Sequence, residues 1–181
     1  MTKIRPIIPK IAANYGLVGG LLTIIAFVTF YYLGHQPWRN LISFILDTII
    51  IGIFCFLPMK EFRTHFNDGS FRFYHGMTLG FITYLMMAFV FSLFYFVFIF
   101  WIEPSFIEMY KSIQKEDMLN MKELIMSTVE EGKEQHFQKQ LDGIDDITRS
   151  QLILDVFLKK AIIGLVLTPI FSVVLRTQPS K

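Results

Sequence analysis

The positions of charged residues leave four long apolar stretches in the chain, at about residues 11–33, 40–58, 77–102 and 159–176. An α-helix rises ~1.5 Å per residue, so about 20 apolar residues cross the ~30 Å hydrocarbon core of a bilayer. The last stretch is apolar only after Lys159 and Lys160, and we expect their ammonium groups to reach water at the membrane edge. The pattern predicts an all-α, polytopic membrane protein with four transmembrane helices.

The composition agrees with this pattern. Of 181 residues, 53% are hydrophobic and 16% are aromatic, which is more apolar surface than one soluble core of this length could bury. The first stretch continues through bulky residues without a small-residue cleavage site, so we expect it to remain attached and not to act as a signal peptide. Only GHQPWR separates it from the second stretch, which predicts two antiparallel neighbouring helices.

Lysine and arginine residues in the connections predict the orientation. The two terminal segments and the connection after the second span hold eight of them, whereas the connection after the first span holds only Arg39. Because cytoplasmic segments are enriched in these residues, we expect both termini in the cytoplasm. The segment 103–158 is then an extracytoplasmic insert, although Lys159 and Lys160 beside it count against this orientation.

The insert, residues 103–158, is polar and has the periodicity of helices. A first helix is predicted through PSFIEMYKSIQK, and a second from a cap at Asp117 to Gly132. Thr148 and Gln151 have the spacing of a capping box, which predicts a helix running directly into the fourth span. The second helix has an apolar stripe, which we interpret as a face packed within a helical cap, with peptide binding as the alternative. Its members are Met118, Met121, Leu124, Ile125 and Val129.

Residues that could carry catalysis or bind a metal are few and scattered. The histidines fall in three different connections without HExxH spacing, and Cys55 is a lone cysteine in an apolar stretch. No GxSxG, P-loop or GxGxxG pattern occurs, and we interpret the run EEGKEQH as solvated charge. The formal charge of +2 gives no reason to expect nucleic acid. We therefore expect no catalytic residue, no metal and no cofactor.

Asp47 lies inside the second apolar stretch, about seven residues or ~10 Å from its outer end. We place three intramembrane polar residues at a similar depth, namely Ser92, Tyr95 and Thr168, and expect no lysine or arginine there. Carboxylates within membrane spans are costly and often belong to ion pathways. Two hypotheses remain open: Asp47 is protonated and pins span two to spans three and four, or it is a proton or cation site of a transporter.

Small residues recur on single faces of two predicted spans. Span one has such residues at every fourth position, and span three has a longer stripe of them. Small side chains allow membrane helices to approach closely. We interpret both stripes as helix-packing faces within the chain, with dimerisation as the alternative. Their members are Ala12, Gly16 and Gly20 in span one, and Gly76, Gly80, Ala88 and Ser92 in span three.

Several segments carry a resemblance to a known family. They are NYGLVGGLLTI in span one, FWIEPSFIEMY after span three, the polar helical insert, and MKEFRTHFNDGSFRFYHGMTLGF between spans two and three. In the last of these, charged residues close span two and the turn is formed by Asn67, Asp68 and Gly69. Over nearly its whole length the chain resembles the domain of unknown function 4199 family of small four-span bacterial membrane proteins. The resemblance implies the bacterial cytoplasmic (inner) membrane and carries over no activity and no catalytic residue.

The sequence therefore favours a non-enzymatic membrane protein. We expect an accessory or scaffold subunit of a larger membrane assembly, or a homo-oligomer, whose partners are the lipid bilayer and another membrane protein or a second copy of itself. A small transporter or channel subunit that uses Asp47 is the alternative, and a membrane enzyme is the third hypothesis.

Overall fold

The computed structural model describes residues 7–122 and 133–177, and the regular elements in these ranges are helical. Four helices in them are long and apolar enough to span a membrane: Ile7–Tyr32, Leu41–Phe66, Phe73–Ile102 and Arg149–Val174. The predicted all-α class and the four apolar helices are therefore confirmed. The chain divides into two compact units, which we describe separately: Met1–Phe94 with Val156–Lys181, and Tyr95–Asp155.

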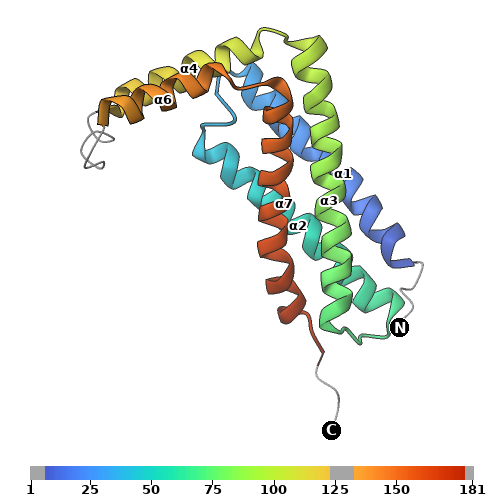
Figure 1. Cartoon of the computed structure of the whole chain (residues 1–181). Helices are drawn as coiled ribbons and strands as arrows, with labels where there is room; N and C mark the ends of the chain where they lie inside the picture. The colour runs from blue at the N-terminus through green and yellow to red at the C-terminus, as the bar shows by residue number, and fades with distance from the viewer. Residues whose placement is uncertain (1–6, 123–132, 178–181) are drawn as a thin grey trace. The chain divides into compact units, whose positions relative to one another are not determined.

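Two of the apolar helices end in a π-helical turn: η1 extends the second helix past its apolar stretch, and η2 carries the third to the end of its stretch at Ile102. The elements in chain order are α1 (Ile7–Tyr32), α2 (Leu41–Glu61), η1 (Phe62–Phe66), α3 (Phe73–Val97), η2 (Phe98–Ile102), α4 (Phe106–Asn120), α6 (Lys133–Asp145) and α7 (Arg149–Val174) (Figure 1).

Residues that favour caps and turns connect the first three helices. Gly34 ends α1 with φ +78°, a conformation that glycine adopts without strain. Asn40 then caps α2, because its side chain accepts a hydrogen bond of 2.8 Å from the Ile42 N–H. Between α2 and α3, Asp68 and Gly69 reverse the chain with φ +48° and +74°. The turn predicted at these residues is confirmed.

The capping box predicted before the fourth apolar helix is also confirmed. The Thr148 N–H donates to Gln151 Oε1 at 2.7 Å, and the Gln151 N–H donates to Thr148 Oγ1 at 3.3 Å. Helix α7 therefore begins at Arg149 and runs without interruption to Val174. Its first ten residues precede the start of the apolar span expected at residue 159.

The helix start predicted at Asp117 is wrong. Helix α4 runs through this residue to Asn120, because the segment from Phe106 onward contains no glycine or proline that would end it. Asp117 consequently lies in the interior of a helix and caps no new one. Of the apolar stripe predicted after it, Met118 and Met121 are described, while Leu124, Ile125, Val129 and the predicted helix end at Gly132 lie outside the described residues.

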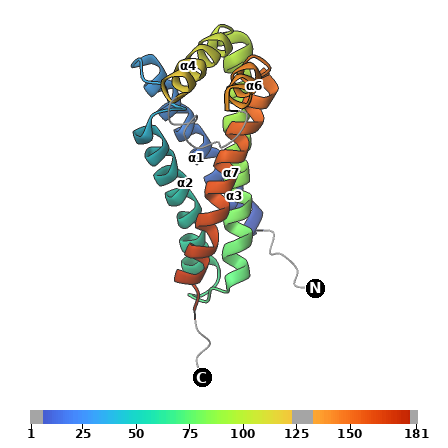
Figure 2. The ribbon, with the colours of Figure 1, turned by 60° about the vertical axis from the view of Figure 1, so that its left-hand side comes forward.

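The first unit is a bundle of α1, α2, α3 and most of α7. Figures 1 and 2 both show α3 running alongside α7, and Figure 1 shows α2 crossing α7 obliquely. Large apolar side chains on the outer faces are more than half exposed, among them Val18, Ile25, Phe89 and Ile162. An outer surface of this composition fits lipid better than water. The interior contains two apolar clusters, one of Ile50, Ile51, Cys55, Tyr84 and Met87, and one of Ile8, Ile11, Ala12, Met59, Phe62, Phe71, Leu79 and Leu175.

The second unit contains the end of α3, η2, α4, α6 and the first turns of α7. Phe106 is its central buried residue, with ring centroids 5.7 Å from Tyr95, 5.6 Å from Phe98 and 6.4 Å from Tyr110. Exposed ion pairs accompany this aromatic cluster, including Lys115 of α4 with Asp145 of α6 at 2.6 Å. The second unit thus combines a small aromatic core with a charged, water-compatible surface.

Candidate functional site

The site that the structure indicates is a buried ion pair within the first unit. Asp47 of α2 and Lys160 of α7 form a salt bridge, and the lysine also donates a hydrogen bond to the carboxylate. The Lys160 side chain is only 4% exposed, whereas Asp47 is 29% exposed. The pair therefore lies at the edge of the bundle, with its cation on the inner side.

A third helix completes the surroundings of Lys160. Its Nζ lies 3.9 Å from the centroid of the Phe91 ring, which belongs to α3. The negative face of an aromatic ring attracts a cation, most strongly where water is excluded. Asp47, Lys160 and Phe91 together join α2, α7 and α3, so one polar contact fixes the relative positions of three apolar helices.

The expectation that Lys160 reaches water is wrong, as is the expectation that no cation lies at the depth of Asp47. The depths of Asp47 and Lys160 in the membrane were counted as if their helices were parallel. Helix α2 instead crosses α7 obliquely (Figure 1), and Asp47 thereby reaches Lys160. Lys159, one residue earlier, is exposed as expected. A sequence signal did exist, since two apolar stretches each contain a charge and the charges have opposite signs.

The ion pair also changes the partner that was expected for Asp47. Hydroxyl partners were expected for it in a region without cations, but its carboxylate accepts a hydrogen bond from the Lys160 ammonium group. The part of the hypothesis in which Asp47 joins span two to other spans keeps its geometric basis, now through Lys160 and Phe91.

Two of the other predicted polar residues also belong to the first unit. Ser92 and Thr168 are buried in the bundle, and Thr168 packs against Gly80. Tyr95 belongs to the second unit, where its ring stacks on Phe98 at 6.4 Å.

The predicted small residues of α1 lie against α3. A Cβ atom added at Gly16 would lie 2.6 Å from Met86 Cβ, and one at Gly20 would lie 2.9 Å from Val90 Cβ. Contacts this short require the neighbouring side chain to move. Ala12 is fully buried in the apolar cluster at the start of the helix. The smooth face of α1 is thus occupied by another helix of the same chain.

The small residues of α3 lie against α7 in the same way. A Cβ atom at Gly76 would overlap Ser172, and one at Gly80 would overlap Thr168. Ala88 is also fully buried. Sequence reasoning missed Gly164 of α7, which meets the Tyr84 ring, although a single glycine in an apolar helix indicates a close contact. Helix α3 is therefore the central helix of the bundle.

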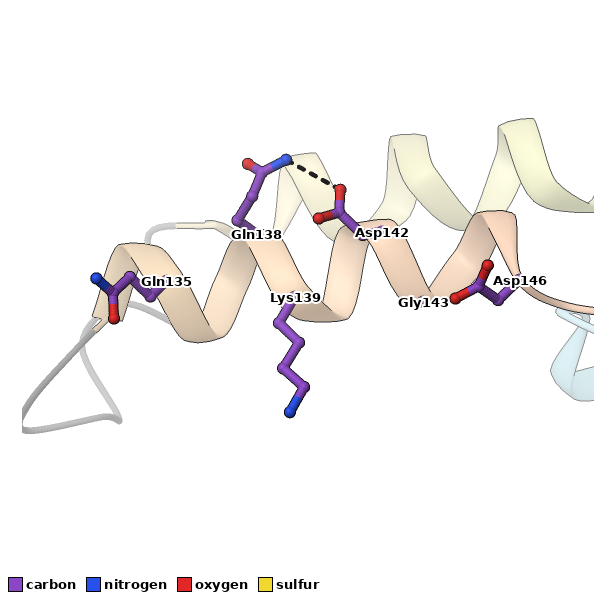
Figure 3. Close-up of a pocket in the computed structure, with 6 residues that line it drawn as sticks. All are labelled: Gln135, Gln138, Lys139, Asp142, Gly143 and Asp146. Carbon is purple, nitrogen blue, oxygen red and sulfur yellow. Dashed lines mark hydrogen bonds between the residues drawn. The ribbon is translucent and has the colours of Figure 1, made fainter.

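The second unit has a shallow hollow along α6, but its shape does not suit a ligand. Five residues of this helix and Asp146, which directly follows it, line the hollow: Gln135, Gln138, Lys139, Asp142, Gly143 and Asp146 (Figure 3). Gln138 donates to Asp142 at 3.2 Å, and Figure 3 shows the Lys139 side chain pointing away from this pair. Binding pockets usually enclose most of a ligand's surface. Within residues 7–122 and 133–177, no three potential metal ligands come together either.

The fold fits a small all-helical membrane protein, because four of its helices are long and apolar enough to span a membrane. Its described residues form close glycine contacts and the ion pair of Asp47 with Lys160. The chain matches the family described as "Protein of unknown function (DUF4199)" over residues 14–177, and it belongs to that family. The family resemblance seen in the sequence is thereby confirmed. No curated protein and no solved structure is detectably similar to the chain.

Proposed function

We propose that the protein is a non-enzymatic accessory or scaffold subunit of a larger membrane assembly, or a homo-oligomer. The observation that carries this proposal is the internal pairing of Asp47 with Lys160 against Phe91. Asp47 and Lys160 are directed at each other, so their first effect is to hold α2 and α7 together. The proposal also places the protein in the bacterial inner membrane, with both termini in the cytoplasm and residues 103–158 outside, as the distribution of lysine and arginine favours.

The outer surface of α3 supports this function. Phe81, Phe89, Leu93 and Phe96 recur along the helix at spacings of three to eight residues and are all exposed. Residues spaced in this way share one face of a helix. Close glycine contacts occupy the opposite sides of α3, so the aromatic face is available to lipid or to another membrane protein.

The test is the mass and composition of the particle at native abundance. The tagged protein is extracted in a mild detergent, its particle mass is measured, and each co-purifying chain is identified by mass spectrometry. We expect a second membrane protein at fixed stoichiometry, or a protein mass that is a multiple of 21.2 kDa. A single 21.2 kDa chain without a stoichiometric partner would contradict the proposal.

A matched pair of variants locates the contact. Phe89→Ala with Leu93→Ala shortens two side chains on the exposed face of α3, and Ile162→Ala with Val166→Ala does the same on α7. If the α3 face binds the partner, the first double variant loses it and the second retains it. Both variants leave the buried contacts of the bundle in place, so loss of the partner does not reflect unfolding.

A second candidate function is a small transporter or channel subunit in which Asp47 is a proton or cation site. The observation that favours it is the uneven burial of the pair, since Asp47 is 29% exposed while Lys160 is 4% exposed. Ionisable residues at membrane depth frequently belong to ion pathways. Flux into proteoliposomes tests this function: Asp47→Asn should abolish the flux without loss of stability if Asp47 carries the ion, and should lower stability if the pair is structural.

A further inference from the structure

Five cationic residues from four segments gather at one end of the first unit. The apolar cluster of Ile8, Phe62, Phe71 and Leu175 brings together the start of α1, the end of α2, the loop before α3 and the end of α7, as Figure 1 shows. A cation lies within two residues of this cluster in each segment. We call this set the basic end: Lys10, Lys60, Arg63, Arg72 and Arg176.

The basic end has a clear excess of positive charge at its surface. Lys10, Lys60, Arg72 and Arg176 are exposed, and Arg63 is half-buried. The acidic residues in the same described segments are Glu61 and Asp68. Five cations therefore face only two acidic residues in these segments. This excess of positive charge allows the surface to bind an anion from outside the chain.

Exposed aromatic side chains are interleaved with these cations. Phe66 is 40% exposed, Phe73 is 40% exposed and Tyr74 is 44% exposed. Aromatic residues beside lysine and arginine at the ends of apolar helices are typical of the interface between hydrocarbon and water. The basic end thus has the composition of a surface that lies among lipid headgroups, since a site for a soluble anion needs no exposed phenylalanine.

Hydrogen bonds hold two of the arginines next to each other. The Phe71 N–H donates to Thr177 Oγ1 at 2.6 Å, and the Thr177 N–H donates to Phe71 O at 2.9 Å. Arg72 directly follows Phe71 and Arg176 directly precedes Thr177, so this double link fixes the two arginines on neighbouring backbone segments. Arg63 is tied to the same loop, because its Nε donates to Gly69 O at 3.3 Å. The backbone segments that carry these arginines are therefore held together before a ligand arrives, which lowers the entropy cost of binding.

We propose that the basic end binds the phosphate groups of anionic phospholipids, with Arg72 and Arg176 as its central residues. Guanidinium groups hold phosphate oxygens through paired hydrogen bonds, and the aromatic side chains rest at the level of the adjoining glycerol and acyl chains. Each cation near an anionic lipid surface contributes about a fivefold gain in affinity. The binding goes beyond the proposed scaffold function and does not depend on it, because it requires only this chain and lipid.

The test uses the full chain in a neutral detergent and follows the thermal unfolding midpoint during titration with lipid. The probes are phosphatidylglycerol, which is anionic, phosphatidylcholine, which is zwitterionic, and inorganic phosphate. We expect phosphatidylglycerol to raise the midpoint by several degrees and the other two probes to have little effect. The rise should shrink at about 1 M salt, where the Debye length falls to about 3 Å.

Two double variants with the same change in charge complete the test. Arg72→Gln with Arg176→Gln removes the central pair, whereas Lys139→Gln with Lys159→Gln removes two exposed cations elsewhere. The first variant should weaken apparent affinity for phosphatidylglycerol by at least about tenfold, and the second should retain it. Equal effects of phosphatidylglycerol and phosphatidylcholine, or an unchanged response of the first variant, would overturn the proposal. A full response to inorganic phosphate alone would overturn the assignment to lipid.

Direct binding to vesicles keeps the proposal testable if the first variant unfolds. Arg72→Lys with Arg176→Lys preserves the charge but removes the paired donors. We expect this variant to bind vesicles of phosphatidylglycerol more weakly than the unchanged protein and more strongly than the glutamine variant. Equal binding of all three proteins would contradict a role for these arginines.

Discussion

The two units of the chain each contain a lysine–aspartate pair, in very different surroundings. In the bundle, Lys160 is 4% exposed and is surrounded by Asp47 and the Phe91 ring. In the second unit, Lys115 is 35% exposed and its partner Asp145 is 61% exposed. A buried pair is costly to break because the remaining charge loses both water and partner, whereas an exposed pair competes with water at all times. Burial therefore decides which of the two pairs holds its unit together.

The largest effect that separates the two pairs is expected from removing each lysine. Lys160→Met leaves Asp47 without its cation and should lower the free energy of unfolding by about 3 kcal/mol, the lower end for a buried pair because Asp47 keeps some exposure. Lys115→Met, the matched control, should cost no more than about 1 kcal/mol. Reversible unfolding in mixed detergent micelles measures the free energy of unfolding of both variants. Equal losses in the two variants would contradict a larger contribution of the buried pair.

The second largest effect concerns glycine, which is also used differently in the two units. Gly80→Ala in α3 places a methyl group against Thr168 and 2.8 Å from Met59 Cε, so we expect a loss of about 1–3 kcal/mol. Gly143→Ala in α6 meets no atom within 4 Å and should gain up to about 1 kcal/mol through helix propensity. The same unfolding measurement applies to both variants, and a gain at Gly80 would show that α3 and α7 are not in close contact.

A smaller effect is expected at the start of α7. Thr148→Ala removes one side of the capping box and should lower the free energy of unfolding by about 1 kcal/mol. Ser150→Ala, two residues later on the exposed side of the same helix, is the control and should change it by less than about 0.5 kcal/mol. Amide hydrogen exchange in the first turn of α7 should rise only in the Thr148 variant, and a similar rise in the control would point away from the cap.

Local signals in the sequence were sufficient for most of the fold. The four apolar helices follow from long runs of residues without charge, and the capping box at Thr148 and Gln151 follows from residue type and spacing. The turn at Asp68 and Gly69 follows from residues that tolerate positive φ. The predicted helix start at Asp117 failed because a capping residue is also tolerated inside a helix, and the apolar periodicity of α4 continues through it.

The candidate site was only half predictable. Asp47 stood out because a carboxylate in an apolar stretch is rare, but its partner depended on the crossing of α2 and α7, which periodicity along one helix does not contain. Lys160 also lay next to a second lysine at the edge of an apolar stretch, a pattern that usually indicates exposure. The burial of one lysine and the exposure of its neighbour follow from which face of α7 meets the bundle, and that is a property of tertiary packing.

The central claim is that Asp47 and Lys160 stabilise the bundle as a pair, and a double-mutant cycle tests it most directly. The free energy of unfolding is measured for the unchanged protein, Asp47→Leu, Lys160→Met and the combined variant, in which an apolar contact replaces both charges. We predict that the combined variant is more stable than Lys160→Met alone, with a coupling energy of about 2–3 kcal/mol. Losses that simply add would contradict the claim and would leave Asp47 free for a role in transport.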